Sequence, residues 1–462
     1  MRSRLSIKYY YSPVKNLQNH NHSECGLKRA KEHQESLPCG WAPFKKSQEI
    51  RQLSSAQPVF AWDEWRQYGV IMPACLFGMV LVAMHAYSLG VMIGPLEAEF
   101  GWSRSQISAG PLVTSVATLL MAPVAGRLLD KHGPRKTALL GVPFYCLCIG
   151  LLGLAGPSIY SWLALYAVLA VALMMVFPTV WTAAIAMRFQ KNRGLAMAIA
   201  LSGTGITSAI VPVVTANLVE AYGWRGAYAG LGIGSFVFVF PLIVVLFDRD
   251  DTHKTFVAQS ARAPWKKVHK NEFMQPRFLL LTAAALLYSI GATGLGINAV
   301  PILIEEGFEL STAAEIAGLI GIGTITGRIL GGFLLDHIDG RFVAVGCGIA
   351  AMFTAAIMLW TEQSAGAAML ACFFLGLAAG AEYDACAYLT TRHFPRRNFG
   401  ALFGIIGALS GVGAGVSPMI ANAIYDVTLT YQTVLWGAFP LFIIASLLFL
   451  MIGHYPDEGD LV

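Results

Sequence analysis

The sequence predicts an all-α membrane protein with twelve transmembrane helices, arranged as two parallel repeats of six helices each. The composition is the first reason, because 56% of the 462 residues are hydrophobic and only 13% are charged. Soluble domains contain about 25% charged residues, so lipid is the main solvent of this chain. The second reason is the regular recurrence of apolar segments of about 20 residues, the length that a helix needs to cross the hydrocarbon core.

These apolar segments fill nearly the whole chain between residues 70 and 453, with short loops between them. The expected spans are 70–96, 104–127, 137–156, 159–187, 194–219, 225–247, 277–304, 312–335, 341–361, 364–391, 399–423 and 431–453.

The remaining segments divide the chain into domains. Residues 1–65 are polar and contain no apolar region of a signal peptide, so we expect a disordered cytoplasmic tail. The N-terminal half then covers residues 66–247, and the C-terminal half covers residues 277–453. A charged cytoplasmic linker at 248–276 joins them, and residues 454–462 form a C-terminal tail.

Lysine and arginine are concentrated in the loops that follow the even-numbered spans, whereas the opposite loops hold Arg104, Arg225 and many acidic residues. The positive-inside rule therefore places both termini in the cytoplasm, in an inner or plasma membrane. The net charge of +5 does not indicate nucleic-acid binding, because the basic residues form no folded patch. The lipid bilayer is the expected partner.

The eight cysteines are scattered and show neither a disulfide framework nor a zinc spacing. In the tail, Cys25 and Cys39 lie near three histidines, which leaves a metal site there as an alternative to plain disorder. We expect no metal and no cofactor.

An offset of 206 residues superimposes the second half on the first without a gap. Because the offset covers six spans, an even number, both halves have the same topology. Parallel repeats of this kind are typical of transporters whose halves rock about a central site. The matching pairs are Pro95 and Pro301, Gly101 and Gly307, Ser105 and Ser311, Gly126 and Gly332, Asp130 and Asp336, Arg135 and Arg341, Gly194 and Gly400, Gly205 and Gly411, Pro212 and Pro418, and Glu220 and Asp426.

The loop between spans 2 and 3, at residues 126–136, resembles the GxLaDrxGrk motif of the major facilitator superfamily. A weaker copy lies at 332–341. Glycine lets two helices touch, and the aspartate can pair with arginine or a helix N-terminus in one conformation, so we expect a gate. A plain positive-inside loop would explain the basic residues but not the repeated Gly-x3-Asp spacing. The expected gating residues are Gly126, Asp130, Arg135, Gly332, Asp336 and Arg341.

Four further stretches are similar to the bacterial monocarboxylate-transporter and oxalate/formate-antiporter branches of that superfamily. They are residues 99–104, 193–196, 223–228 and 380–384. The resemblance covers about residues 70–453 and implies the major facilitator fold and transport of a small organic anion.

Arg328 lies within span 8, four residues before Gly332. An arginine in a span is costly unless it faces a water-filled cavity, and its guanidinium can bind a carboxylate with two parallel hydrogen bonds. The resemblance implies the same role, because related carriers place an arginine in this helix for the substrate carboxylate. The alternatives are that Arg328 extends to the membrane surface or pairs with Asp336.

The sequence departs from the proton-coupled monocarboxylate carriers at two positions. Thr324 stands where those carriers have an aspartate, and Tyr87 stands where they have a lysine. Glu382 and Asp384 in span 10 are then the remaining intramembrane acids. Two residues apart on a helix, they point about 200° apart and cannot share one cavity face. We assign proton coupling to one of them and leave open which pairs with Arg328.

Other polar or aromatic groups within the spans are candidates for lining the substrate cavity. A lone aromatic residue in a span also packs or anchors at the interface, so that alternative stays open for each. The candidates are His85, Tyr87, Trp181, Asn298 and Tyr388. Ser202 to Gly205 in span 5 resemble a close-packing face of small residues.

The sequence therefore predicts a monomeric secondary transporter of a small, monocarboxylate-like organic anion, working by alternating access with proton symport or anion exchange. An exporter of drugs or metabolites from the same superfamily is the alternative. A membrane enzyme would need a Ser/His or metal-ligand pair on facing helices, and a primary pump would need a nucleotide-binding loop; the sequence shows neither. A receptor would not need a gate motif in both halves.

Overall fold

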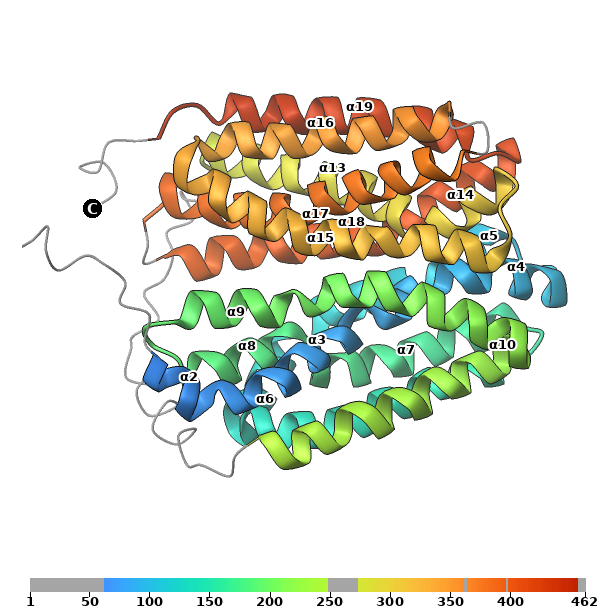
Figure 1. The fold of residues 1–462 in the computed structure, drawn as a ribbon, viewed down its shortest axis with the longest axis horizontal. Helices are drawn as coiled ribbons and strands as arrows, with labels where there is room; N and C mark the ends of the chain where they lie inside the picture. Colours follow the sequence, from blue (N-terminus) through green and yellow to red (C-terminus); the bar gives the residue numbers. More distant parts are fainter. Residues whose placement is uncertain (1–61, 248–272, 361–363, 396–397, 456–462) are drawn as a thin grey trace, which may run out of the picture. The chain divides into compact units, whose positions relative to one another are not determined.

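A computed structural model describes residues 62–247, 273–360, 364–395 and 398–455. Every regular element within these ranges is a helix (Figure 1). The N-terminal half contains α2 (Trp62–Tyr68), η1 (Gly69–Ile71), α3 (Met72–Tyr87), α4 (Leu89–Phe100), α5 (Arg104–Ile107), α6 (Ala109–Leu151), η2 (Leu152–Leu154), α7 (Ile159–Val176), α8 (Pro178–Ala186), α9 (Arg193–Leu201) and α10 (Gly203–Leu246). The C-terminal half contains α13 (Pro276–Ile297), α14 (Ala299–Glu305), α15 (Leu310–His337), α16 (Gly340–Leu359), α17 (Ala365–His393), α18 (Phe399–Thr428) and α19 (Gln432–Met451).

The expected domain bounds fall partly outside the described residues. The structure describes only the start of α2 in the tail at 1–65, only 273–276 in the linker, and only His454 and Tyr455 in the C-terminal tail. The first span differs from its expected bounds, since helix already begins at Trp62, eight residues before the expected start at residue 70. The bounds of the tails and linker stay predictions.

Ten helices among the described residues are long and apolar enough to cross a membrane. Two of them are too long for one crossing, with 51 residues in Arg104–Leu154 and 54 in Arg193–Leu246. A straight helix of that length would extend about 75 Å, whereas the hydrocarbon core is about 30 Å thick. Non-helical backbone interrupts α6 at Gly133 and α10 at Gly223. Each long segment therefore provides two spans, which confirms the predicted twelve.

The break in α10 depends on glycine. Gly223 has φ 68° and ψ 171°, a conformation that a side chain would make sterically unfavourable. Figure 1 shows the consequence, because α10 runs in one direction from α9 and then returns along the bundle.

The backbone repeats with the register that the sequence predicts. Gly101 and Gly307, 206 residues apart, both have a positive φ, at 66° and 93°. Gly223 and Leu429 are again 206 apart and have φ values of 68° and 56°. Helix starts agree as well, since α9 begins at Arg193 and α18 at Phe399. The two-repeat fold is confirmed.

Close glycine packing joins α15 to α17. A methyl group added at Gly327 would collide with the carbonyl oxygen of Leu377, and one added at Gly380 with that of Thr324. Gly323 meets the backbone of α17 in the same way, at Phe373. Small residues spaced by four let membrane helices approach this closely. The two helices that carry Arg328 and Asp384 are thereby held at backbone contact.

The halves meet along two pairs of helices. Gly205 of α10 packs against Gly321 of α15, which confirms the close-packing face expected in span 5. Gly415 of α18 packs against Ser115 of α6. We call the end of the bundle with loops 101–103 and 429–431 the Arg104 end, on the right in Figure 1, and the opposite end the Asp130 end.

Contact between α18 and α6 stops toward the Asp130 end. The face of α18 that carries Gly415 continues through Gly411, Gly407, Gly404 and Gly400, at helical spacings of three and four residues. A methyl group added at any of these four glycines would meet no atom within 4 Å. The halves are therefore packed together at the Arg104 end and separated along this face.

Candidate functional site

Arg328 projects from the face of α15 that meets the other half. Gly321 and Ile325 on that face contact Gly205 of α10. Arg328 follows Ile325 by three residues and Gly321 by seven, so all three share one side of the helix. The guanidinium thus lies at the joint between the halves, on the Asp130 side of the contact that Gly205 of α10 makes with Gly321 and Ile325.

Arg328 forms an ion pair with Asp384 of α17, with 3.5 Å between a guanidinium nitrogen and a carboxylate oxygen. The two side chains are 13% and 32% exposed, so the pair is sheltered but reachable. The ring of Tyr383 lies 6.0 Å from the guanidinium carbon. The buried Nε of Arg328 has no hydrogen-bond partner among the described residues. A tight charged pair has a separation of about 2.7–2.9 Å, so Asp384 uses Arg328 only in part.

Glu382 points away from this pair into the core of the C-terminal half. Its side chain is buried, and its carboxylate accepts a hydrogen bond from Cys386 Sγ at 3.0 Å. Cys347 of α16 and Tyr288 of α13 lie within electrostatic reach. The two acids therefore occupy opposite faces of α17, as their spacing predicts, and Asp384 is the one beside Arg328.

His85 lies inside the N-terminal half, away from the Arg328 pair. Its ring nitrogens are 3.4 Å from Thr114 Oγ1 and 3.5 Å from the Tyr145 hydroxyl, both on α6. The ring of Tyr166 on α7 lies 6.4 Å away. The structure places His85 in a buried polar cluster of one half.

The aromatic candidates are dispersed. Trp181 is fully buried, donates to the carbonyl oxygen of Val176 and covers Gly78 in the N-terminal core. Tyr87 is half-buried on α3, at the Ser208 hydroxyl of α10. Tyr388 packs on Gly340 at the start of α16, near the Asp130 end. No hydrogen bond or ion pair joins any of the three to the Arg328–Asp384 pair among the described residues, so the expected shared cavity wall stays a prediction.

Asn298 lies in a hydrogen-bonded cluster at the Arg104 end. Its side-chain oxygen accepts from Asn422 Nδ2 at 2.8 Å, and its amide donates to Gly294. Asn422 also donates to Ser108 of the other half. Asn298 is thus placed with groups that connect the halves rather than with Arg328.

The first gate motif lies open. A methyl group added at Gly126 would meet no atom within 4 Å, and Asp130 is exposed. Neither Asp130 nor Arg135 has an ion-pair partner among the described residues, and the buried Nε of Arg135 lacks a hydrogen bond. The helix contact expected at Gly126 is absent from this conformation.

The second motif is organised around a residue that the sequence did not indicate. Arg341 pairs with Asp339 at 2.8 Å, whereas Asp336 is exposed and Gly332 faces open space. Burial alone would raise the pKa of Asp339, but hydrogen bonds from Arg341 lower it to about 2. His454 adds a contact of 3.1 Å to Arg341. Asp339 also accepts from the Arg341 backbone N–H and caps α16. An acid directly before a helix start is the signal that could have found it.

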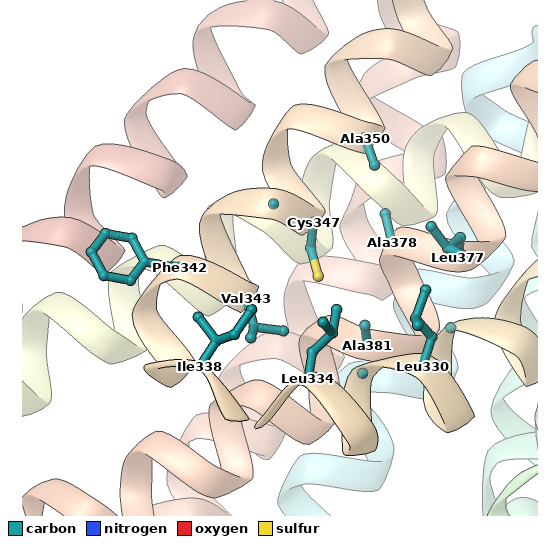
Figure 2. A pocket seen from close by; sticks show the side chains of 13 residues that line it. Leu330, Leu334, Ile338, Phe342, Val343, Cys347, Ala350, Leu377, Ala378 and Ala381 are labelled. Atoms are coloured by element: carbon teal, nitrogen blue, oxygen red, sulfur yellow. The ribbon is translucent and has the colours of Figure 1, made fainter. Parts of the chain in front are cut away.

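A cavity of about 240 Å³ lies between α15, α16 and α17 (Figure 2). Its walls include Leu334, Cys347 and Ala381, and no charged side chain lines it. Figure 2 shows side chains from all three helices around it. The charged pair is separate from this apolar cavity.

No group of three metal-ligating side chains occurs within residues 62–247, 273–360, 364–395 and 398–455. Cys25, Cys39 and the nearby histidines lie outside these ranges.

Comparison with known proteins agrees with this architecture. The chain is 24% identical to monocarboxylate transporter 12 of Xenopus laevis, over 63% of this chain and 66% of that protein. It is 25% identical to a probable sulfoacetate transporter of Cupriavidus necator, over 71% of this chain and 80% of that protein. The crystal structure of a D-xylose–proton symporter matches the fold with a TM-score of 0.66 at 13% identity, over 85% of this chain and 99% of that one.

The family model of the major facilitator superfamily matches residues 75–384 and 341–461. These matches cover most of the chain, including both repeats and both gate motifs. The two relatives and the structural neighbour described above are transporters, not enzymes. The chain is an integral membrane transporter and belongs to the major facilitator superfamily.

Proposed function

We propose that this transporter carries a small organic anion, a carboxylate, and that Arg328 binds the anionic group. The observation that carries the proposal is the incomplete use of the guanidinium. Arginine offers five N–H donors in a planar fork that matches a carboxylate. Asp384 approaches only to 3.5 Å, and Nε is unpartnered.

The position of Arg328 suits alternating access. It lies on the face of α15 that meets the other half. The halves are in contact at the Arg104 end and are separated along the glycine face of α18 toward the Asp130 end. A substrate bound there would be exposed to one side in this conformation and to the other after the halves rock. Two relatives whose names specify a monocarboxylate and sulfoacetate support an anionic cargo.

Asp384 couples substrate binding to the movement of a proton or a second anion. A substrate carboxylate that binds Arg328 competes with Asp384, and the displaced Asp384 is then free to take a proton. Thr324 occupies the helix position where related carriers have an acid, and Asp384 brings an acid to Arg328 from the neighbouring helix. The same competition serves exchange of one anion for another, so the coupling is proton symport or anion exchange.

The test is uptake of labelled carboxylates into proteoliposomes, with and without a pH gradient. We expect Arg328→Gln to lower uptake at least tenfold, since a charged hydrogen bond contributes about 1.5–3 kcal/mol. Arg225→Gln is the control, because Arg225 is half-exposed at the Arg104 end and pairs with Glu99 there. Equal uptake by wild type and Arg328→Gln would contradict the proposal, and transport of neutral compounds by both would instead support a drug or metabolite exporter.

We further propose that both termini are cytoplasmic in an inner or plasma membrane and that the carrier acts as a monomer. The basic loops at the Asp130 end support this orientation. Alkylation of a cysteine introduced at exposed Lys131 should then require a membrane-permeant reagent in intact cells, whereas one at exposed Tyr160 should react with an impermeant reagent.

A further inference from the structure

The two halves are tied together at the Arg104 end by buried and partly buried polar contacts. In the N-terminal half these contacts involve Arg104, Ser105 and Ser108; in the C-terminal half they involve Asn298, Asn422, Tyr425, Asp426 and Tyr431. We call these eight residues the Arg104 latch.

The carboxylate of Asp426 on α18 caps the N-terminus of α5 in the other half. Its carboxylate oxygens accept the backbone N–H groups of Arg104 and Ser105, both at 3.1 Å. The first N–H groups of a helix have no partner within the helix, so they need an external acceptor. Ser103 caps Gln106 within the same half, which leaves the two preceding N–H groups to Asp426. Separation of the halves would return these two donors and the carboxylate to water.

The side chain of Arg104 adds a second connection across the halves. Its guanidinium carbon lies 3.9 Å from the ring centre of Tyr425, a cation–π distance. It also donates to the Tyr431 hydroxyl at 3.3 Å. The pair with Glu97 at 3.0 Å stays within the N-terminal half and does not join the halves.

Asn422 forms the buried centre of the latch. Its amide nitrogen donates to Ser108 at 2.7 Å and to Asn298 at 2.8 Å, and its oxygen accepts from Tyr431 at 2.6 Å. Asn422, Asn298 and Ser108 are all 0% exposed. Because Ser108 belongs to the other half, parting the halves breaks this buried hydrogen bond and exposes the amide donor to water.

The repeat supplies a built-in comparison. Glu220 is the residue related to Asp426 by the 206-residue offset, yet Glu220 is exposed and has no hydrogen-bond partner among the described residues. Asn422 aligns with Ala216, and Tyr431 with Arg225. The polar connection therefore exists on one side of the pseudo-symmetric joint only.

We infer that the Arg104 latch is a conformational lock that holds the carrier closed at the Arg104 end and open at the Asp130 end. Releasing it lets the halves rock, so that the face of α18 carrying Gly411, Gly407, Gly404 and Gly400 closes on α6 at the other end. The latch determines the resting population of the two states, independently of which substrate is carried.

The test measures distances at both ends with spin labels, without substrate. Tyr222→Cys with Val427→Cys reports the Arg104 end, since these positions are 73% and 84% exposed in different halves. His132→Cys with Ile338→Cys reports the Asp130 end, and these exposed positions are related by the repeat. The background replaces the eight native cysteines. Electron–electron double resonance in lipid nanodiscs gives the distance distributions.

We expect Asp426→Asn and Asn422→Ala each to raise the ratio of open to closed molecules at the Arg104 end about tenfold, with a matching shortening at the Asp130 end. Tyr431→Phe removes two hydrogen bonds, of which only the one from Arg104 crosses between the halves, and it keeps the ring. It should therefore shift both distributions less, and it serves if either stronger variant fails to fold. Glu220→Gln and Glu99→Gln are matched controls and should leave both distributions unchanged, because Glu99 pairs with Arg225 within the N-terminal half.

Unchanged distances in all three latch variants would overturn the inference, and so would an equal shift in the controls. Opening at the Arg104 end without closure at the Asp130 end would also overturn it, because the lock must couple the two ends. Since no substrate is present, none of these results bears on the proposed anion specificity.

Discussion

Arg328 of α15 and Asp384 of α17 form their 3.5 Å ion pair at positions whose repeat counterparts are Ala122 and Pro178. The N-terminal half thus carries neither charge at the equivalent place, although its backbone repeats the same helices. The C-terminal half supplies the charged chemistry of the site. The N-terminal half faces it with small residues such as Gly205.

Competition between Asp384 and the substrate for Arg328 predicts that the substrate binds more tightly when Asp384 is replaced. Asp384→Asn removes the internal anion from Arg328, so the best carboxylate of the transport panel should bind about tenfold more tightly to the purified carrier. Glu382→Gln should leave the affinity unchanged, because Glu382 bonds to Cys386 and faces away. Isothermal titration calorimetry measures both; weaker binding by Asp384→Asn would show that Asp384 holds Arg328 in position instead.

The glycine packing between α15 and α17 should be intolerant of a methyl group. Gly380→Ala forces a Cβ into the carbonyl of Thr324, and we expect a destabilisation of about 1–3 kcal/mol from overpacking. Gly346→Ala is the control, since that position has open space within the same half. Thermal unfolding in detergent should show a lower Tm for the first variant alone. Equal Tm values would mean that the helices separate without cost.

A larger side chain at the glycines of α18 that face open space should block transport without unfolding the protein. In this conformation a Cβ atom added at Gly404 meets no atom within 4 Å, so the Tm of Gly404→Val should stay near that of wild type. The other state needs that face against α6, so uptake should fall more than tenfold. Gly234→Val, at an open glycine of the other half, is the control. Full uptake by Gly404→Val would contradict closure along this face.

The Asp339–Arg341 pair predicts a pH-dependent contribution to stability. The pKa of Asp339 is lowered from its ordinary 3.8 to about 2, so the pair stabilises the folded state above pH 4 and loses this contribution as the pH falls toward 2. Since the pair is partly exposed, we expect Asp339→Asn to cost about 1 kcal/mol at pH 7. Thermal unfolding of the wild type and Asp339→Asn between pH 2 and pH 7 should give Tm values that converge at the acidic end. A constant difference across this range would exclude the ionic origin.

Much of the fold could be predicted because lipid imposes simple rules on the chain. Spans are read from length and hydropathy, and the repeat follows from matched positions such as Pro95 and Pro301. The long helices α6 and α10 each contain two spans, and Gly133 and Gly223 break them inside the loops predicted between spans 2 and 3 and between spans 5 and 6. Their positive φ values depend on backbone geometry that composition does not reveal.

The site could be predicted less completely, because its contacts join residues far apart in the chain. The opposite orientation of Glu382 and Asp384 follows from helical spacing alone. Which of them meets Arg328 depends on how α17 packs on α15, and that contact is set by Gly327 and Gly380. The latch shows the same limit more strongly, since Asn422 reaches a serine 314 residues away. The sequence around either residue does not indicate such a distant partner.

The bare face of α18 has a consequence for the speed of the conformational cycle. Glycines have no side-chain rotamers, so bringing Gly400, Gly404, Gly407 and Gly411 against another helix immobilises no side chain of their own. Long side chains on that face would add an ordering cost of up to about 2 kcal/mol each at every turnover. The surface that closes and reopens in the inferred cycle therefore adds no side-chain ordering cost at these four positions.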